Sequence, residues 1–324
     1  MIANLVETYL VPLTFGVIHT WLVLGLAPLA VGVVRLTKAR LQGRRGASPL
    51  QPYRDLWRLL QKESVIAHSA TWLFRVAPYL VFVSVWLAAT IMPTYTTHMI
   101  MTPAADLLAL AALLGLARFL TALAGLDVGT PFGGLGASRE MFIAALGEPA
   151  MLMVIFSLSI LAHTTSPAQL VAFVQSGHVG LSVSVGLSLG TLLMVAIAEN
   201  GRIPIDNPST HLELTMVHEA MVLEYSGRHL ALMEAAGMVR LLLFMSIIGS
   251  VFIPWGVAGP DDGLGGVLLG LVLWLAKIAV MSVLLGGFES LVAKMRIFRI
   301  ADFLGGALLL ALLAAIFLYV SEAV

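Results

Sequence analysis

The side chains of this chain that could do chemistry are carboxylates and cations within long apolar runs. Ionisable groups inside a bilayer are costly and mark ion pathways by default. Glu148, in "REMFIAALGEPAMLM", lies about two turns into such a run and is followed by Pro149, which frees a backbone carbonyl of the preceding turn. If no cation pairs with it, this carboxyl could exchange a proton near neutral pH. The alternative is a structural hydrogen bond to a neighbouring helix.

Two cations could serve as counter-charges to buried acids. Lys277 is in the middle of the apolar run "LVLWLAKIAVMS", and Arg118 occupies a similar position in another run. Each could pair with a carboxylate, either for ion movement or only for helix assembly. Charged residues near the ends of the runs are cheaper, because their side chains can extend to the interface. Those residues are Glu7, Arg75, Glu289 and Asp302.

A third group of candidates is the acidic segment "AENGRIPIDNPSTHLELTMVHEAMVLEYSG". Pro204 and Pro208 break the chain, and a helix is expected to start at Ser209 or Thr210. If that helix is continuous, residues at steps of three and four fall within one stripe on its surface. The stripe comprises His211, Thr215, His218, Val222, Tyr225 and His229. The helix could simply lie on the membrane surface. Alternatively, its acids continue a chain of carboxylates through Glu148, Glu199, Glu213 and Glu224.

No catalytic or metal-binding motif is recognised. "HEAMV" lacks the second histidine of HExxH, and His211 and His218 are about two turns apart. The absence of cysteine excludes disulfides and cysteine-held iron–sulfur clusters within this chain. "GTPFGGLGASRE" lacks the lysine of a phosphate-binding loop. We expect it to be a bent connection that positions Arg139 and Glu140. No nucleic-acid-binding patch is present.

The apolar composition predicts an all-α membrane protein. The 324 residues are 59% hydrophobic and 11% charged, whereas soluble domains have about 25% charged residues. Runs long enough to cross a bilayer core of about 30 Å recur along the chain. The expected eight spans are Leu5–Val34, Trp72–Met92, Pro103–Leu126, Met141–His163, Val179–Ala198, Met238–Val257, Leu264–Phe288 and Phe303–Val320. No internal repeat is visible, so residues 1–324 are expected to form a single polytopic domain.

The basic residues occur only in alternate connections. These are the segments at about 35–71, 127–140, 199–237 and 289–302. The positive-inside rule places them in the cytoplasm and both termini outside, as in a multi-pass protein of the cytoplasmic (inner) membrane. The segment 35–71 mixes leucine, tryptophan and bases, which is typical of an amphipathic helix at the lipid interface. Such charge asymmetry also indicates that a partner docks on the inner face.

Several motifs in this order carry a family resemblance. They are "ARLQGRRGASPLQPYRDLWRLL", "GLDVGTPFGGLGASREMFIAALGEP", "AENGRIPIDNPSTHLEL…EYSG", "VFIPWG" and "AKMRIFRIADFLG". The chain resembles the H-subunit family of NADH–quinone oxidoreductases along nearly its whole length. It is most similar to the branch found in formate hydrogenlyase and other membrane-bound nickel–iron hydrogenases.

The resemblance implies a membrane foot on which a soluble redox arm docks. The implied partners are hydrogenase-like large and small subunits, an iron–sulfur subunit and antiporter-like membrane subunits. Iron–sulfur clusters and a nickel–iron centre would be held by those partners, with no cofactor in this chain. The predicted ion-pathway residues are Glu148, Glu199, Asp206, Glu213, Glu224 and Lys277. The predicted interface residues are Arg44, Arg45, Arg139, Glu140, Arg202, His211, His218 and Arg228.

This chain departs from the quinone branch in the acidic segment. Here "DNPSTHLEL" has neutral residues and a histidine where that branch has more acids. The departure favours the hydrogenase branch and leaves open whether His211 or His218 carries protons, which an unperturbed pKa near 6.5 would permit. Three alternatives remain: a quinone-chamber subunit, a stand-alone secondary transporter, and a purely structural anchor.

Overall fold

The computed structural model is a bundle of helices. It describes residues 11–176, 182–206, 217–259, 262–293, 295 and 299–323. Within these residues the only β pairing is one isolated bridge between Thr96 and Ala258. Seven helices are long and apolar enough to cross a membrane. The expected all-α membrane fold is therefore confirmed.

The seven long helices match seven of the expected spans, and the largest shifts are at the starts of α6 and α10. They are α2 (Val11–Leu41), α4 (Trp72–Ile91), α5 (Leu107–Asp127), α6 (Pro131–Ala162), α10 (Gly227–Val251), α11 (Leu264–Leu291) and α12 (Arg299–Ala323). The expected fifth span corresponds to the apolar helix α8 (Val183–Glu199), which has 17 residues and is shorter than the others. The shorter elements are α3 (Gln51–Gln61), η2 (Thr102–Ala104), α7 (Pro167–Gln175) and α9 (His218–Val222).

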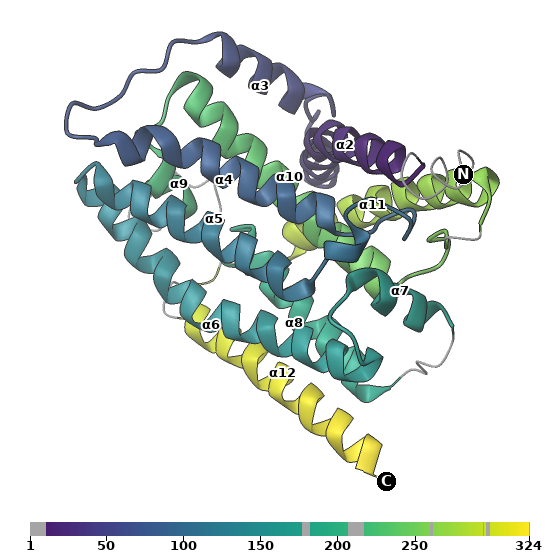
Figure 1. The fold of residues 1–324 in the computed structure, drawn as a ribbon. Coiled ribbons are helices and arrows are strands. Elements are labelled where there is room, and N and C mark those ends of the chain that lie inside the picture. Colours follow the sequence, from purple (N-terminus) through teal and green to yellow (C-terminus); the bar gives the residue numbers. More distant parts are fainter. Residues whose placement is uncertain are drawn as a thin grey trace.

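The long helices pack in a layered order that brings distant segments together. Helices α4, α5, α6 and α12 follow one another side by side (Figure 1), and α12 also packs along α8. Helix α10 lies behind this row, against α4 and α2, and it has the most buried window of the seven long helices. At one end of the bundle, Thr71 before α4 bonds Asp127 at the end of α5. Helix α9 lies at that same end (Figure 1), which we call the α9 end.

The glycine-rich segment before the fourth span is helical, and the expectation of a bent connection there was wrong. The side chain of Thr130 accepts a hydrogen bond from the Gly133 amide at 3.3 Å, and Pro131 occupies the first turn, so α6 starts ten residues before Met141. Both features favour a helix start. The glycines serve close packing, because a Cβ on Gly133 would lie 2.1 Å from the carbonyl oxygen of Gly125 on α5.

This crossing gives a matched pair of expected results. We expect Gly133→Ala to destabilise the protein by about 1–3 kcal/mol, because the backbone of α5 would have to move. Gly134→Ala is the control, since a Cβ there meets nothing within 4 Å. Alanine is a better helix former than glycine by about 1 kcal/mol, so the control should be neutral or stabilising. Thermal unfolding of the two variants in detergent measures the difference, and equal melting temperatures would contradict the close crossing.

The acidic segment does not form one continuous helix through His229. Helix α9 ends at Val222, and the backbone is extended at Ser226 (φ −139°) and left-handed at Gly227 (φ +55°) before α10 begins. The Ser226 hydroxyl bonds both the amide and the carbonyl of Val65, which holds the break in place. His229 therefore belongs to α10, which begins eleven residues ahead of the expected start of that span. Residues 207–216 lie outside the described part of the chain, with the expected helix start, His211 and Glu213 among them.

A candidate carboxylate relay beside a polar cavity

One arginine inside the bundle forms ion pairs with three acids. Arg118 comes from α5 and its side chain is 1% exposed. Its Nε lies 2.9 Å from Glu140 Oε1, and its Nη2 lies 2.6 Å from Glu199 Oε2 at the end of α8. A third nitrogen, Nη1, lies 3.8 Å from Glu148 Oε1. The arginine is thus a counter-charge to buried acids, as its sequence position indicated.

The three acids differ sharply in exposure. The side chains of Glu140 and Glu199 are 9% and 5% exposed, whereas that of Glu148 is 46% exposed. Glu140, which was predicted at the interface with the redox arm, is buried in this cluster. Because α6 begins at Pro131, Glu148 lies near the middle of that helix and not close to its start.

Arg240 is a second buried cation beside the cluster, and it was not among the residues predicted from the sequence. It is 9% exposed, and it acts electrostatically on both Glu199 and Glu140 without forming an ion pair with either. The signal was present, since a lone arginine in the apolar run "GMVRLLLFM" is expensive in lipid. The expected span began only two residues earlier, at Met238. Arg240 therefore resembled a residue at the end of a span, where a charge can reach the interface at little cost.

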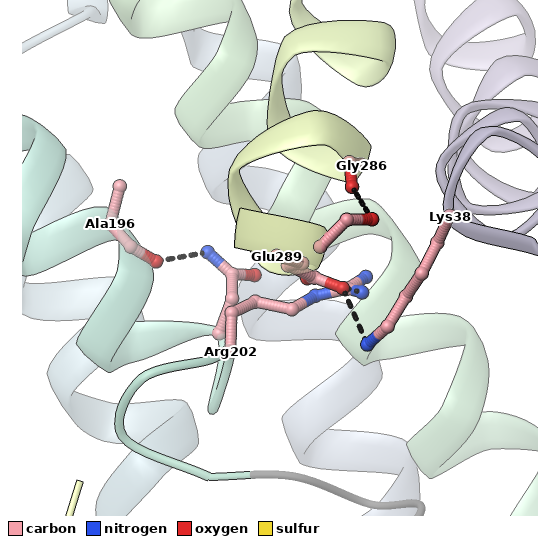
Figure 2. A network of polar contacts seen from close by, with 7 residues as sticks. Lys38, Ala196, Arg202, Gly286 and Glu289 are labelled. Atoms are coloured by element: carbon pink, nitrogen blue, oxygen red, sulfur yellow. Dashed lines mark hydrogen bonds and ion pairs between the residues drawn. The ribbon is translucent and has the colours of Figure 1, made fainter. Parts of the chain in front are cut away.

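A second ion-pair cluster joins three parts of the chain that are distant in sequence. Glu289 on α11 is buried and lies between Lys38 of α2 and Arg202 of the α8–α9 connection (Figure 2). The Lys38 Nζ–Glu289 Oε2 distance is 3.3 Å and the Arg202 Nη1–Glu289 Oε1 distance is 3.2 Å. Burial lowers the pKa of Arg202, and Glu289 opposes that effect. The carboxylate thus keeps two neighbouring cations in place.

A polar cavity of about 510 Å³ lies beside this second cluster. Its walls come from α2, the α8–α9 connection, α9, α10 and the end of α11. Asp206 lines it and accepts a hydrogen bond from the Val217 amide at 3.0 Å, which joins two residues of the acidic segment that are eleven positions apart. Arg44, Arg202 and His218 also line the cavity. Asp206 therefore belongs to the cavity wall and does not contact Arg118 in an ion pair.

The remaining predicted site residues are spread over the α9 end. Arg45 and Arg228 are exposed, and Glu224 is partly buried in the turn between α9 and α10. Arg139 lines a second groove with Phe142 and Ile300. These positions are compatible with a docking surface for another subunit.

Lys277 is not the counter-charge of a buried acid among the described residues. Its ammonium donates to the carbonyl oxygens of Gly249, at 3.1 Å, and Ile253, at a shorter distance. These are at or just beyond the end of α10, where the helix macrodipole is negative and carbonyls lack helical partners. The expected pairing was wrong because helix termini offer a lysine an alternative to carboxylates that the apolar pattern does not reveal.

His218 is poorly suited to carry protons near neutral pH. Burial lowers its pKa from the ordinary 6.5 to about 3, and the positive charge of Arg240 adds to this effect, while Asp206 opposes it. The imidazole is therefore neutral throughout the physiological range. His218 can still donate or accept a hydrogen bond at the cavity wall.

The lowered pKa of His218 predicts a pH-dependent stability. Above pH 6.5 the histidine is neutral in both the folded and the unfolded protein, so it has no effect. As the pH falls from 6.5 towards about 3, only the unfolded state gains this proton, and stability decreases. We expect His218→Gln to lose less stability than the wild type between about pH 7 and about pH 5, measured by thermal unfolding in detergent. The exposed His68, replaced in the same way, is the control. Parallel pH profiles for wild type and His218→Gln would contradict the assignment.

The site and fold together define a class of protein: a helical membrane subunit with buried carboxylates and no metal-binding group of histidine and acidic side chains among the described residues. The chain belongs to the NADH dehydrogenase family, whose model matches residues 13–320. This match confirms the family resemblance.

Two relatives that match most of the chain come from hydrogen-metabolising systems. The chain is 32% identical to formate hydrogenlyase subunit 4 of Escherichia coli (strain K12), over 87% of this chain and 91% of that protein. It is also 32% identical to hydrogenase-4 component C of the same organism, over 90% and 91%. NADH-quinone oxidoreductase subunit 8 of Rhodothermus marinus is 26% identical over 71% of this chain and 70% of that protein.

A solved structure shares the fold. The match is to a chain of the membrane-bound sulfane sulfur reductase, an archaeal respiratory membrane complex, with a TM-score of 0.77. It covers 94% of this chain and 98% of the other at 17% sequence identity. The arrangement of helices is thus common to proteins whose sequences have diverged widely.

Proposed function

We propose that this chain is the membrane-anchoring and ion-coupling subunit of a redox complex of the membrane-bound nickel–iron hydrogenase or formate hydrogenlyase type. Two relatives named for such systems match most of its length. In this proposal, iron–sulfur clusters and a nickel–iron centre in partner subunits carry the electrons. The energy released moves a proton or a sodium ion through the membrane part of the complex. The chain itself holds no redox group.

The observation that carries the proposal is the Arg118 cluster. One guanidinium holds three carboxylates at different depths, with Glu140 and Glu199 buried and Glu148 half-exposed. Three acids share one cation in direct contact, with Arg240 as a second cation nearby, so the group can bind a further proton. Glu199 is the last residue of α8, whereas Glu148 lies near the middle of α6. A path for protons would run from the former to the latter.

The exposure of Glu148 supports a membrane partner on this side of the bundle. Leu152, one turn further along α6, is apolar and exposed, and Gly115 of α5 lies beside the Glu148 carboxylate. Lipid offers a carboxylate no hydrogen-bond partner. An adjoining antiporter-like subunit with polar groups at this depth would provide one, and would receive the proton that Glu148 releases.

The α9 end is the proposed docking surface for the redox arm. Exposed arginines gather there with the cavity and the connection that carries Arg202 and His218. We place this end in the cytoplasm and both termini outside, in the cytoplasmic membrane, because the basic residues fall in these connections. Helix α3 supports this arrangement, since it is strongly amphipathic and presents Trp57 and Leu60 on its exposed side.

Purification of the tagged chain in mild detergent tests the proposal. We expect iron–sulfur proteins, antiporter-like subunits and nickel to be recovered in near-stoichiometric amounts, as measured by mass spectrometry and metal analysis. Iron without nickel would favour a quinone-linked relative instead. A chain that purifies alone, folded and stable, would contradict the proposal and favour a stand-alone transporter.

A further inference from the structure

The polar cavity contains a buried cation that forms no ion pair within the described part of the chain. Arg240 on α10 lines the cavity and is 9% exposed. Its Nε makes no hydrogen bond, and it forms no ion pair with any residue that the structure describes. A buried charge without a partner costs several kcal/mol. A ligand that supplies negative charge would remove that cost.

Four acids line the cavity, and none of them forms an ion pair with Arg240: Asp206, Glu219, Glu234 and Glu289. Glu289 is already shared by Lys38 and Arg202, and Asp206 accepts the Val217 amide. The largest favourable electrostatic effects on Arg240 come from Glu199 and Glu140, whose carboxylates contact Arg118. Arg35 and Arg44 add further positive charge to the wall. Five basic and four acidic side chains line the cavity, so its wall carries a net positive charge that favours an anion beside Arg240.

Two more features describe what that anion must carry. The Oδ1 atom of Asn200, in the same wall, is buried without a hydrogen-bond partner and would accept a hydroxyl or water proton. Apolar side chains form another part of the wall. Its apolar residues are Val31, Val34, Val222, Met233 and Met238. The ligand thus needs a charged group, a neighbouring hydroxyl and space for a hydrocarbon portion.

We propose that this cavity is a binding site for a phosphate oxyanion, held by Arg240, with the apolar wall covering the hydrocarbon of the molecule that carries it. The planar guanidinium matches a phosphate group through two parallel hydrogen bonds. An anionic membrane lipid with a hydroxylated head group supplies all three features, whereas free inorganic phosphate lacks the hydrocarbon portion. The site differs from the carboxylate relay in taking an anion.

Ligand-induced stabilisation of the complex tests this site. The complex is purified with its partner subunits, stripped of lipid, and its melting temperature is measured with phosphatidylglycerol, phosphatidylcholine or inorganic phosphate. We expect phosphatidylglycerol to raise the melting temperature of the wild type and to have at most half that effect on Arg240→Gln. A shift with inorganic phosphate alone would assign the site to a free oxyanion. Equal shifts with phosphatidylglycerol and zwitterionic phosphatidylcholine would overturn the proposal.

A second variant keeps the test independent of the arginine. Gly237 lies three residues before Arg240 in the cavity wall, and a Cβ there meets nothing within 4 Å. We expect Gly237→Leu to fold, to occupy part of the cavity and to abolish the phosphatidylglycerol shift. The exposed Arg299 on α12, changed to glutamine, is the matched control and should keep the full shift. A full shift in both Arg240→Gln and Gly237→Leu would overturn the proposal, as would recovery of a neutral quinone in place of phospholipid from the native cavity.

Discussion

Replacing Arg118 by methionine is expected to destabilise the protein by about 3–5 kcal/mol, the usual cost of removing one partner from a buried ion pair. The change leaves Glu140 and Glu199 buried beside one another without the cation that contacts both. Thermal unfolding of the purified complex in detergent should show a clear fall in melting temperature. This is the largest loss of stability that we expect from a single substitution in this chain.

Two further variants show whether the loss comes from unpaired charge. Arg75→Met changes an exposed cation on α4 and should have little effect, because isolated surface charges contribute about 0–1 kcal/mol. Adding Glu199→Gln to Arg118→Met removes one of the two buried acids and should restore part of the lost stability. If the double variant melts below the single one, the electrostatic explanation is wrong and the side chain of Arg118 acts mainly through packing.

Replacing Glu199 by glutamine is expected to abolish most ion movement while electron transfer in the partner subunits continues. Glutamine keeps the size and hydrogen-bonding capacity of the side chain, but it cannot bind and release a proton near neutral pH. Glu199 is 5% exposed and is the acid of the cluster that lies at the end of α8. Proteoliposomes containing the complex and a pH-sensitive or sodium-sensitive dye would give the number of ions moved per electron transferred.

The structure provides a control for the Glu199→Gln measurement and a second variant of the same cluster. Glu63→Gln alters an exposed acid in the connection before α4 and should leave coupling unchanged. Glu148→Gln should resemble Glu199→Gln, since both acids contact the same guanidinium. If both variants assemble and still move ions at the wild-type ratio, the cluster serves only to hold helices together, as in the purely structural alternative.

The sequence alone was sufficient for the class of protein. Apolar runs and alternating basic connections identify a multi-pass membrane protein, because lipid imposes the same length and polarity on every span. The motifs placed the chain in its family before any contact was known. Glu148 and Glu199 were found as candidates for the same reason, since an acid within an apolar run is costly wherever it lies.

Helix boundaries were less predictable where glycine and proline occur. "TPFGGLG" was taken as a connection, yet Thr130 and Pro131 start a helix and the glycines let α6 approach α5. The opposite error occurred after α9, where Ser226 and Gly227 end a pattern that was expected to continue. In both places the deciding contact is with a segment distant in sequence, which local propensity does not represent.

Only the tertiary structure decided which charges meet. Arg118 was one of several possible counter-charges, and it contacts Glu140, Glu148 and Glu199 because α5, α6 and α8 bring them to one point. Lys277, equally plausible from its position, bonds the end of α10 instead. Arg240 became a candidate only when α10 proved to begin at Gly227 and to line a cavity. The physical reason is that the cost of burying a charge can be read along one helix, whereas the partner that offsets it depends on how several helices pack.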